Sequence, residues 1–500
     1  MPAILVNSRT TMSKQEVHSL GASGLPNQQA ISPPLVVDLD GTLIKTDSLA
    51  ESLFGLMRQN PLYLFLLPFW LFKGKAFLKR QISQRVILDA SLLPYHHELL
   101  DYLKLQRAQG RLLVLATASD EQIAKQVADY LQIFDRVLAS NGPINLSGQN
   151  KQSCLVAEFG EKYFDYVGNS RRDLAVWSSA RKAILVNPRM GLSRRAASVT
   201  EIEQVFRNPK RKLRLYLQAL RLHQWLKNLL VFVPLAMAHR FFEMDLLGRT
   251  FLAFLAFGLC ASSVYLVNDL LDLQSDRHHP RKRQRPFATG ELSFFWGLGL
   301  APFLLCLSLL VSLLLPLSFL GTLAIYYVLN LSYSFYLKRI VLFDVIVLAG
   351  LYTLRVMAGS AAISVWPSSW LLAFSTFIFL SLALVKRYAE LVTMEAESGV
   401  VQVRGYRIVD KELLASLGSG SGYVAVLVLA IYISSGVAEI HYTRHYLVWL
   451  LCPLLLYWIS YVWLMAHRGT MQDDPLVFTI RDRVSRIVLL LSAVVLLLAK

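Results

Sequence analysis

Residues 268–290 read NDLLDLQSDRHHPRKRQRPFATG, so amide and acidic side chains stand directly before a basic cluster, at the end of an apolar run. On a helix, Asn268, Asp272 and Asp276 fall at i, i+4 and i+8 and share one face. Oxygen ligands suit Mg²⁺, which completes its shell with water and substrate phosphates. The basic side chains that follow suit the remaining charge of a diphosphate; they are Arg277, Arg281, Lys282, Arg283 and Arg285. The spacing predicts a magnesium–diphosphate site. A solvated topology loop is the alternative, disfavoured because charge is costly at a membrane boundary.

A second pair of carboxylates, Asp38 and Asp40, stands in the string DLDGT after an apolar run. The ends of such strands are where open α/β sheets hold their ligands. With the backbone turning at Gly41, one carboxylate can attack phosphorus while the other transfers the proton of the leaving group. This pattern predicts phosphoryl chemistry.

The composition separates a soluble part from a membrane part. The 500 residues are 54% hydrophobic, and the apolar residues concentrate after about residue 223. Much of the net charge of +17 sits in short loops beside apolar runs, so membrane orientation and phosphate binding explain it better than nucleic-acid binding. The four cysteines are isolated, which argues against a disulfide framework and a zinc site.

The first part alternates short apolar strands with helices, which predicts a parallel sheet covered on both sides. We expect a disordered N-terminus over residues 1–30 and an α/β domain over 31–190. The apolar segment Pro61–Phe72 is too short to span a membrane. It is either a buried helix of a cap over the site or an interfacial helix that dips into the bilayer beside basic residues.

The second part begins after a basic linker and amphipathic helix over 191–220, and we expect a membrane domain over 221–500. Its apolar segments lie near 223–241, 246–268, 291–311, 313–332, 341–361, 370–385, 420–437, 445–465 and 484–499. The predicted fold is therefore an N-terminal α/β domain with a parallel sheet and helical cap, followed by an all-α polytopic bundle of nine transmembrane helices. Lysine and arginine gather in the loops on one side, so the segment 268–290 and the α/β domain are expected to face the cytoplasm.

The string NDxxDxxxD followed by RP-x-x-x-G resembles the signature of the UbiA superfamily of intramembrane prenyltransferases, whose fold is a bundle of nine helices. The matching residues are Asn268, Asp269, Asp272, Asp276, Arg285, Pro286 and Gly290. The flanking strings RLHQWLKN and HPRKRQRP resemble the decaprenyl-phosphate phosphoribosyltransferase branch. This resemblance implies Mg²⁺ on Asn268, Asp269, Asp272 and Asp276, with Asp272 and Asp276 catalytic. The candidate substrate-binding residues are Lys227, Lys282, Arg285, Lys338 and Arg355. Asp344 and Arg355 lie three helical turns apart and are expected to face the cavity together.

The DxDGT string resembles the haloacid dehalogenase superfamily of phosphatases. By that match Asp38 is the nucleophile and Asp40 the acid/base. The later elements follow in the family's order, with Thr117 and Lys151 as substrate-binding residues and Asn169 and Asp173 joining the two aspartates at Mg²⁺. The family usually has aspartate where this chain has Asn169, and an amide lends the metal no charge.

One departure from the UbiA pattern bears on the substrate. Family members that use prenyl diphosphates generally carry a second acidic motif, whereas the matching loop here begins with Lys386 and Arg387 and has no DxxxD. This favours a different donor. Asp473 and Asp474 in the last such loop are better explained as a capped turn than as catalytic carboxylates.

The sequence thus predicts a bifunctional membrane enzyme. It would transfer 5-phosphoribose from phosphoribosyl diphosphate to a polyprenyl phosphate in the cytoplasmic (inner) membrane, with both sites in the cytoplasm, and the fused phosphatase would remove the 5-phosphate. Two alternatives stay open: an aromatic or quinone prenyltransferase, and an α/β domain that is a catalytically silent binding module or a phosphatase of another substrate. Whether the protein forms a homo-oligomer also stays open.

Overall fold

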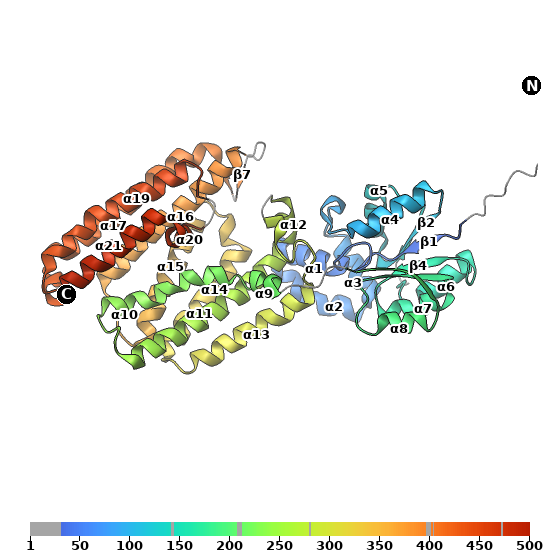
Figure 1. Cartoon of the computed structure of the whole chain (residues 1–500), viewed down its shortest axis with the longest axis horizontal. Helices are drawn as coiled ribbons and strands as arrows, with labels where there is room; N and C mark the ends of the chain where they lie inside the picture. The colour runs from blue at the N-terminus through green and yellow to red at the C-terminus, as the bar shows by residue number, and fades with distance from the viewer. Residues whose placement is uncertain are drawn as a thin grey trace, which may run out of the picture.

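The structure is a computed structural model that describes residues 32–141, 145–207, 213–279, 282–396, 402–403, 405–471 and 474–500. The predicted disorder of residues 1–30 lies outside these residues, as do Arg281 and Asp473. The molecule is elongated, with an α/β domain at one end and a bundle of helices at the other (Figure 1).

The α/β domain is built on a six-stranded parallel sheet in the order β3-β2-β1-β4-β5-β6. The strands are β1 (Leu35–Val37), β2 (Leu113–Asp120), β3 (Arg136–Ser140), β4 (Asp165–Gly168), β5 (Lys182–Val186) and β6 (Glu201–Phe206). Strands β1 and β4 are buried along their whole length, as expected for strands covered on both faces. Separate apolar clusters pack on the two faces of the sheet. The predicted parallel sheet is confirmed.

The predicted end of this domain at residue 190 is wrong. Residues assigned to a linker form α8 (Leu192–Ala197) and β6, which pairs with β5 from Glu201 to Phe206. The strand was missed because it lies at the sheet edge and half of its residues are polar, with Phe206 as its buried residue. The helix predicted to lead into the membrane domain is α9 (Leu213–Ala219).

The remaining helices of the domain lie between its strands in the chain. They are α1 (Ser48–Gln59), η1 (Pro61–Phe65), α2 (Leu67–Phe72), α3 (Lys75–Ser83), η2 (Ala90–Leu92), α4 (His97–Ala108), α5 (Glu121–Leu131), α6 (Gln149–Phe159), η3 (Arg171–Asp173) and α7 (Leu174–Ser179). Helices α1 to α3 are inserted between β1 and β2, the position at which the helical cap was predicted.

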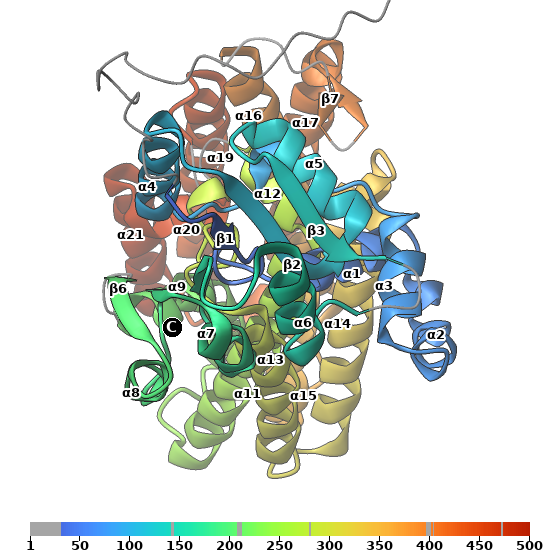
Figure 2. The ribbon, with the colours of Figure 1, turned by 90° about the vertical axis from the view of Figure 1, so that its right-hand side faces the viewer.

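The apolar segment Pro61–Phe72 forms η1 and α2, and none of its residues is buried. Phe65, Phe69 and Phe72 are 73%, 67% and 89% exposed. The interpretation as a buried cap helix is therefore wrong. In the end-on view, α2 projects sideways from the domain, past the outline of the helices behind it (Figure 2). Insertion into a bilayer stays a prediction.

The bundle begins with an irregular segment, η4 (Leu222–Phe232) and α10 (Val233–Met237). The long helices are α11 (Met244–Leu271), α13 (Phe294–Ser312), α14 (Leu317–Phe335), α15 (Phe343–Ala362), α16 (Ser369–Ala396), α17 (Lys411–Ser434), α19 (Leu451–His467) and α21 (Arg483–Ala499). Shorter elements are α12 (Leu273–His278), η5 (Lys282–Gln284), η6 (Leu337–Arg339), η7 (Ile408–Asp410), α18 (Val437–His441), η8 (His445–Leu450) and α20 (Pro475–Arg481), with a small hairpin of β7 (Gln402–Val403) and β8 (Tyr406–Arg407).

Six helical segments among the described residues are long and apolar enough to cross a membrane: Met244–Leu271, Phe294–Ser312, Phe343–Ala362, Ser369–Thr393, Ile408–Ser434 and His445–His467. Nine spans are not confirmed. Segment 223–241 is broken into a 3₁₀ stretch and a five-residue helix that has Pro234 in its first turn. Segment 313–332 lies mainly in α14, and 484–499 in the 17-residue α21. The chain is nonetheless an integral membrane protein by its apolar helices.

Candidate active sites

The first site lies at the carboxyl end of β1. Asp38 accepts hydrogen bonds at Oδ1 from Lys151 Nζ (2.7 Å) and at Oδ2 from Thr42 Oγ1 (3.3 Å). Lys151 extends from the first turn of α6 and is 3% exposed. Its ammonium also donates to the hydroxyl of Tyr166 (3.0 Å), which in turn donates to Asp173 Oδ1 (3.0 Å). The predicted nucleophile thus has the predicted lysine as its counter-charge.

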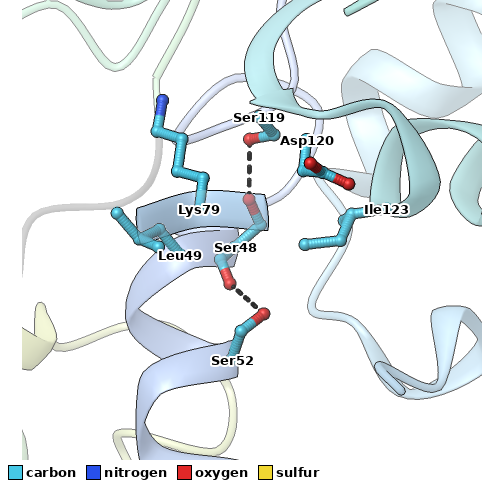
Figure 3. Close-up of a pocket in the computed structure, with 7 residues that line it drawn as sticks. All are labelled: Ser48, Leu49, Ser52, Lys79, Ser119, Asp120 and Ile123. Atoms are coloured by element: carbon cyan, nitrogen blue, oxygen red, sulfur yellow. Dashed lines mark hydrogen bonds between the residues drawn. The ribbon is translucent and has the colours of Figure 1, made fainter. Parts of the chain in front are cut away.

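Asp40 is held on the other side of the same loop. Its Oδ1 accepts from the backbone N–H of Ser48 (2.8 Å), and its Oδ2 from Ser119 Oγ (2.5 Å). The hydroxyls of Ser48 and Ser119 hydrogen-bond to each other (2.7 Å) beside a small pocket that Lys79 also lines (Figure 3). Thr117 lies two residues before Ser119, and its hydroxyl accepts from the Ser119 N–H (3.0 Å). The two serines and Tyr166 were missed because single hydroxyls carry no recognisable sequence pattern.

Asn169 and Asp173 close the site from the loop after β4. A Cβ built on Gly41, whose φ is +71°, would meet the Asn169 amide nitrogen at 2.1 Å. The close approach and the left-handed backbone both require glycine there. Asp173 Oδ2 accepts from the N–H groups of Asn169 (3.1 Å) and Ser170 (2.8 Å). The six predicted residues of this site therefore lie together at the carboxyl ends of β1, β2 and β4 and at the start of α6.

Burial governs the electrostatics of this pair of carboxyls. Desolvation raises the pKa of Asp38 to about 6, against the opposing effect of the Lys151 ammonium. Desolvation and the charge of Asp47 raise the pKa of Asp40 to about 6, while hydrogen bonds from Ser119 and Ser48 oppose the rise. A proton donor with a pKa close to neutral suits general acid catalysis.

The second site lies where α11 meets α12. The acidic motif comprises residues 268–276, and its side chains bind two separate sets of basic residues. Lys338 Nζ donates to Asn268 Oδ1 (3.3 Å) and to both Asp272 oxygens (2.8 and 3.1 Å). The guanidinium of Arg58, from α1, lies 4.0 Å from Asp272 Oδ1. Asn268 and Asp272 thus share one cation, as their spacing of four residues predicts.

Asp269 and Asp276 form the other half of the motif. Arg285 Nη1 donates to Asp276 Oδ2 (2.6 Å) and Asp269 Oδ1 (3.1 Å). Arg221 also donates to Asp269. Desolvation raises the pKa of Asp276 to about 6, against the attraction of Arg285. Asp276 and Asp272 therefore have different basic partners, and between the two helices Asp272 departs from ideal helical geometry, with φ −95° and ψ 11°. Arg221 was not predicted, although it opens the string RLHQWLKN.

Lys227 and Arg355 contact residues outside the acidic motif. Lys282 lies in η5, three residues before Arg285. Lys227 pairs with Asp474 (2.7 Å), which Lys386 also contacts (3.1 Å). Asp474 is thus a fully paired buried carboxylate as well as the N-cap of α20.

Arg355 donates to Asn228 Oδ1 (3.0 Å) and to the Tyr326 hydroxyl (2.9 Å). Asp344 instead contacts Arg387 and Tyr406. The expectation that Asp344 and Arg355 face one cavity together is therefore wrong, because each has its own buried partners.

The donor sets of both sites suit a hard divalent cation. The first offers Asp38, Asp40, Asn169 and Asp173, and the second offers Asn268, Asp269, Asp272 and Asp276, all oxygen ligands of the kind that Mg²⁺ prefers. Within the described part of the chain, no three acidic, histidine or cysteine residues are gathered closely enough to hold a metal. Basic side chains hold several of these carboxylates instead.

Comparison with known proteins places the second site in a family. The UbiA prenyltransferase family model matches residues 229–494 of the 500. The chain is 36% identical to the uncharacterized protein y4nM of Sinorhizobium fredii, over 90% of this chain and 88% of that protein. It is 34% identical to nodulation protein NoeC of Azorhizobium caulinodans, over 55% of this chain and 90% of NoeC.

A third relative is the decaprenyl-phosphate phosphoribosyltransferase of Mycolicibacterium smegmatis, which is 37% identical over 37% of this chain and 60% of that protein. The resemblance to this branch is confirmed at the level of sequence similarity. With more than half of its residues matched by the family model and its acidic motif at the end of a membrane helix, the chain belongs to the UbiA prenyltransferase family.

Proposed function

We propose that the protein is a bifunctional enzyme that transfers 5-phosphoribose from phosphoribosyl diphosphate to a polyprenyl phosphate and then removes the 5-phosphate from the lipid product. The observation that carries this proposal is the placement of both sites at the same end of the bundle, joined by helix α1. The N–H of Ser48 at its start contacts Asp40, and Arg58 near its end approaches Asp272. Ten residues of helix span about 15 Å.

In the transfer step, an oxygen of the lipid phosphate attacks the anomeric carbon of the ribose, and the bond from that carbon to the diphosphate breaks. Positive charge grows on the ribose while negative charge grows on the departing diphosphate. Lys338 and Arg285, with Arg58 beside them, supply cations to that diphosphate once it enters between them and the carboxylates. Mg²⁺ held by Asn268, Asp269, Asp272 and Asp276 would act as a Lewis acid on the diphosphate oxygens.

In the second step, Asp38 attacks the phosphorus of the 5-phosphate, and the bond from phosphorus to the ribose oxygen breaks. Asp40 gives its proton to that oxygen, which leaves as a hydroxyl. Water then attacks the aspartyl-phosphate, Asp40 takes a proton from it, and inorganic phosphate leaves. Lys151 holds Asp38 and neutralises the phosphate, while Mg²⁺ at the carboxylates would add further charge.

Two further observations support this scheme. The segment that should hold a second acidic motif in a prenyl-diphosphate enzyme begins with Lys386, which lies in helix α16 and contacts Asp474. The relative y4nM is similar over 90% of this chain, a length that includes both domains. Basic loops at the end of the bundle that bears the α/β domain favour a cytoplasmic location of both sites in an inner membrane.

The fusion is tested with Asp38→Asn. The amide lacks the anionic oxygen that forms the aspartyl-phosphate but keeps the side chain's shape. Purified wild type, supplied with Mg²⁺, phosphoribosyl diphosphate and a polyprenyl phosphate, should yield the dephosphorylated ribosyl lipid. The variant should accumulate the 5-phosphorylated lipid, as measured by mass spectrometry. Asp129→Asn, at an exposed position on α5, is the matched control.

Identical lipid products from wild type and Asp38→Asn would contradict the coupling of the two domains. Parallel reactions with a prenyl diphosphate and 4-hydroxybenzoate test the alternative of an aromatic prenyltransferase. Turnover of that pair, without turnover of phosphoribosyl diphosphate, would replace the proposed donor.

A further inference from the structure

The α/β domain touches the second site itself, through helix α1 and the loop before it. The guanidinium of Arg58 lies 4.0 Å from Asp272 Oδ1, and its side chain is 36% exposed. The backbone carbonyl of Arg58 accepts from Arg339 Nη2 (3.2 Å), and Arg339 follows directly after Lys338, the cation that binds Asp272. Helix α1 is thus tied to the segment that supplies Lys338.

A second contact, buried between the domains, joins Glu51 to Arg277. Both oxygens of Glu51 accept from the guanidinium, at 2.8 Å each, and the two side chains are 2% and 5% exposed. Arg277 directly follows Asp276, and its Nε donates to the carbonyl of Ala288 (2.9 Å). A buried bidentate pair fixes the guanidinium in position and orientation. Glu51 therefore holds α12 and the turn after it together.

The turn that closes the second motif packs against the same domain. A Cβ added at Gly290, whose φ is +70°, would meet Lys45 Cβ at 2.9 Å, Thr46 Cγ2 at 3.1 Å and Pro94 Cγ at 3.2 Å. Phe54 of α1 also packs edge-on against Phe294, at the start of α13 (5.7 Å between ring centres). The segment from Asp272 to Phe294 thus rests on the α/β domain at several points.

We propose that helix α1 is a working part of the transferase site: Arg58 is a binding residue for the donor diphosphate, and Glu51 is a positioning residue that keeps Asp276 and Arg285 in place through Arg277. The proposal rests on the proposed function of the acidic motif as a diphosphate site. It assigns the α/β domain a role in transfer that is separate from phosphatase chemistry. The Arg58 side chain is exposed enough to reach a ligand. It is also close enough to the acidic motif to contact the same diphosphate.

The first test measures binding of inorganic pyrophosphate with Mg²⁺ to the full chain in nanodiscs by calorimetry. Arg58→Gln should weaken binding by about tenfold, the loss of one charge-assisted hydrogen bond at a partly exposed site. Arg195→Gln, on an exposed face of α8, is the matched control and should bind as wild type does. Equal affinities of wild type and Arg58→Gln, or no binding by wild type, would overturn the assignment of Arg58.

The second test concerns Glu51. It must distinguish a local shift of the acidic motif in the variant from a general disturbance of the fold. Glu51→Gln should raise the KM for phosphoribosyl diphosphate by about tenfold or more and leave the KM for the lipid phosphate unchanged, since the motif contacts the donor alone. Arg277→Gln should do the same, and the double variant should lose no more than Arg277→Gln does. Glu98→Gln, exposed on α4, is the control. Unchanged donor KM in Glu51→Gln, or additive losses in the double variant, would refute the positioning role.

The two proposals fail in different ways. Wild type that binds pyrophosphate through Arg58 but transfers no phosphoribose refutes the proposed donor and supports the role of α1. Wild type that transfers phosphoribose with unchanged kinetics in Arg58→Gln and Glu51→Gln refutes the role of α1 and supports the proposed function.

Discussion

Replacing Lys151 with methionine tests how charge is balanced in the proposed phosphatase site. Lys151 Nζ lies 2.7 Å from Asp38 Oδ1, and both groups are buried. An opposite charge this close lowers the pKa of a carboxyl by roughly 1–3 units. Because the pKa of Asp38 is about 6 with the lysine present, its removal should raise that pKa to about 7–9.

The expected loss of activity follows from the ionised fraction of Asp38. At pH 7 this fraction should fall from about nine-tenths to between about one-half and one-hundredth, so ionisation alone lowers kcat/KM by about 2- to 100-fold. The lost contact with phosphate adds to this. The distinguishing sign is the acid limb of the kcat/KM profile, which should move to higher pH by at least about one unit.

The assay is hydrolysis of p-nitrophenyl phosphate with Mg²⁺ from pH 4.5 to 9. Lys162→Met is the matched control, because Lys162 lies in the same domain and donates to the carbonyls of Ser178 and Ala180, not to a carboxylate. An acid limb at the same pH in wild type and Lys151→Met would refute the reasoning, even if the rate fell.

Stability should change with pH in a defined direction in the same variant. The folded pKa of Asp38 is above its unfolded value of 3.8, so its contribution favours folding at low pH and is lost as pH rises through the folded pKa. Removing one partner of a buried ion pair costs about 3–5 kcal/mol while the other is charged. Lys151→Met should therefore be destabilised more at pH 8 than at pH 5 in thermal unfolding, and an equal loss at both would contradict this assignment.

Three further predictions concern the bundle and the cap. Asp272→Ala should abolish transfer and its Mg²⁺ dependence without preventing membrane insertion, because the carboxylate serves substrate charge and not packing; normal turnover would exclude Asp272 from the site. Arg285→Ala should raise the KM for phosphoribosyl diphosphate by about tenfold. An unchanged KM would mean that Arg285 serves only membrane orientation. Phe69→Asp, on the exposed face of α2, should reduce hydrolysis of the lipid-linked phosphate while p-nitrophenyl phosphate is hydrolysed as before, because we predict that the exposed apolar segment contacts the bilayer. Equal hydrolysis of the lipid-linked phosphate by wild type and Phe69→Asp would count against that contact.

The sequence alone predicted the chemistry that we propose for both sites. The spacing of Asp38 and Asp40, with a glycine between strand and helix, predicts a loop at the end of a buried strand, and the structure has it there. The order of Thr117, Lys151 and Asp173 sufficed because parallel strands bring their carboxyl ends to one edge, whatever the length of the helices between them. Apolar length likewise identified six of the predicted spans, since crossing a bilayer requires about 20 apolar residues.

Tertiary structure decided what local spacing does not contain. Helical spacing predicted Asn268, Asp272 and Asp276 on one face, but in the structure Asp276 pairs with Arg285, whereas Asp272 pairs with Lys338. The edge strand β6 forms because β5 offers it a partner. Above all, Glu51 and Arg277 are 226 residues apart in the chain, and their pairing appears only when the two domains meet. Buried charges find their partners through the fold because an unpaired charge there costs several kcal/mol, a constraint that acts across space and not along the sequence.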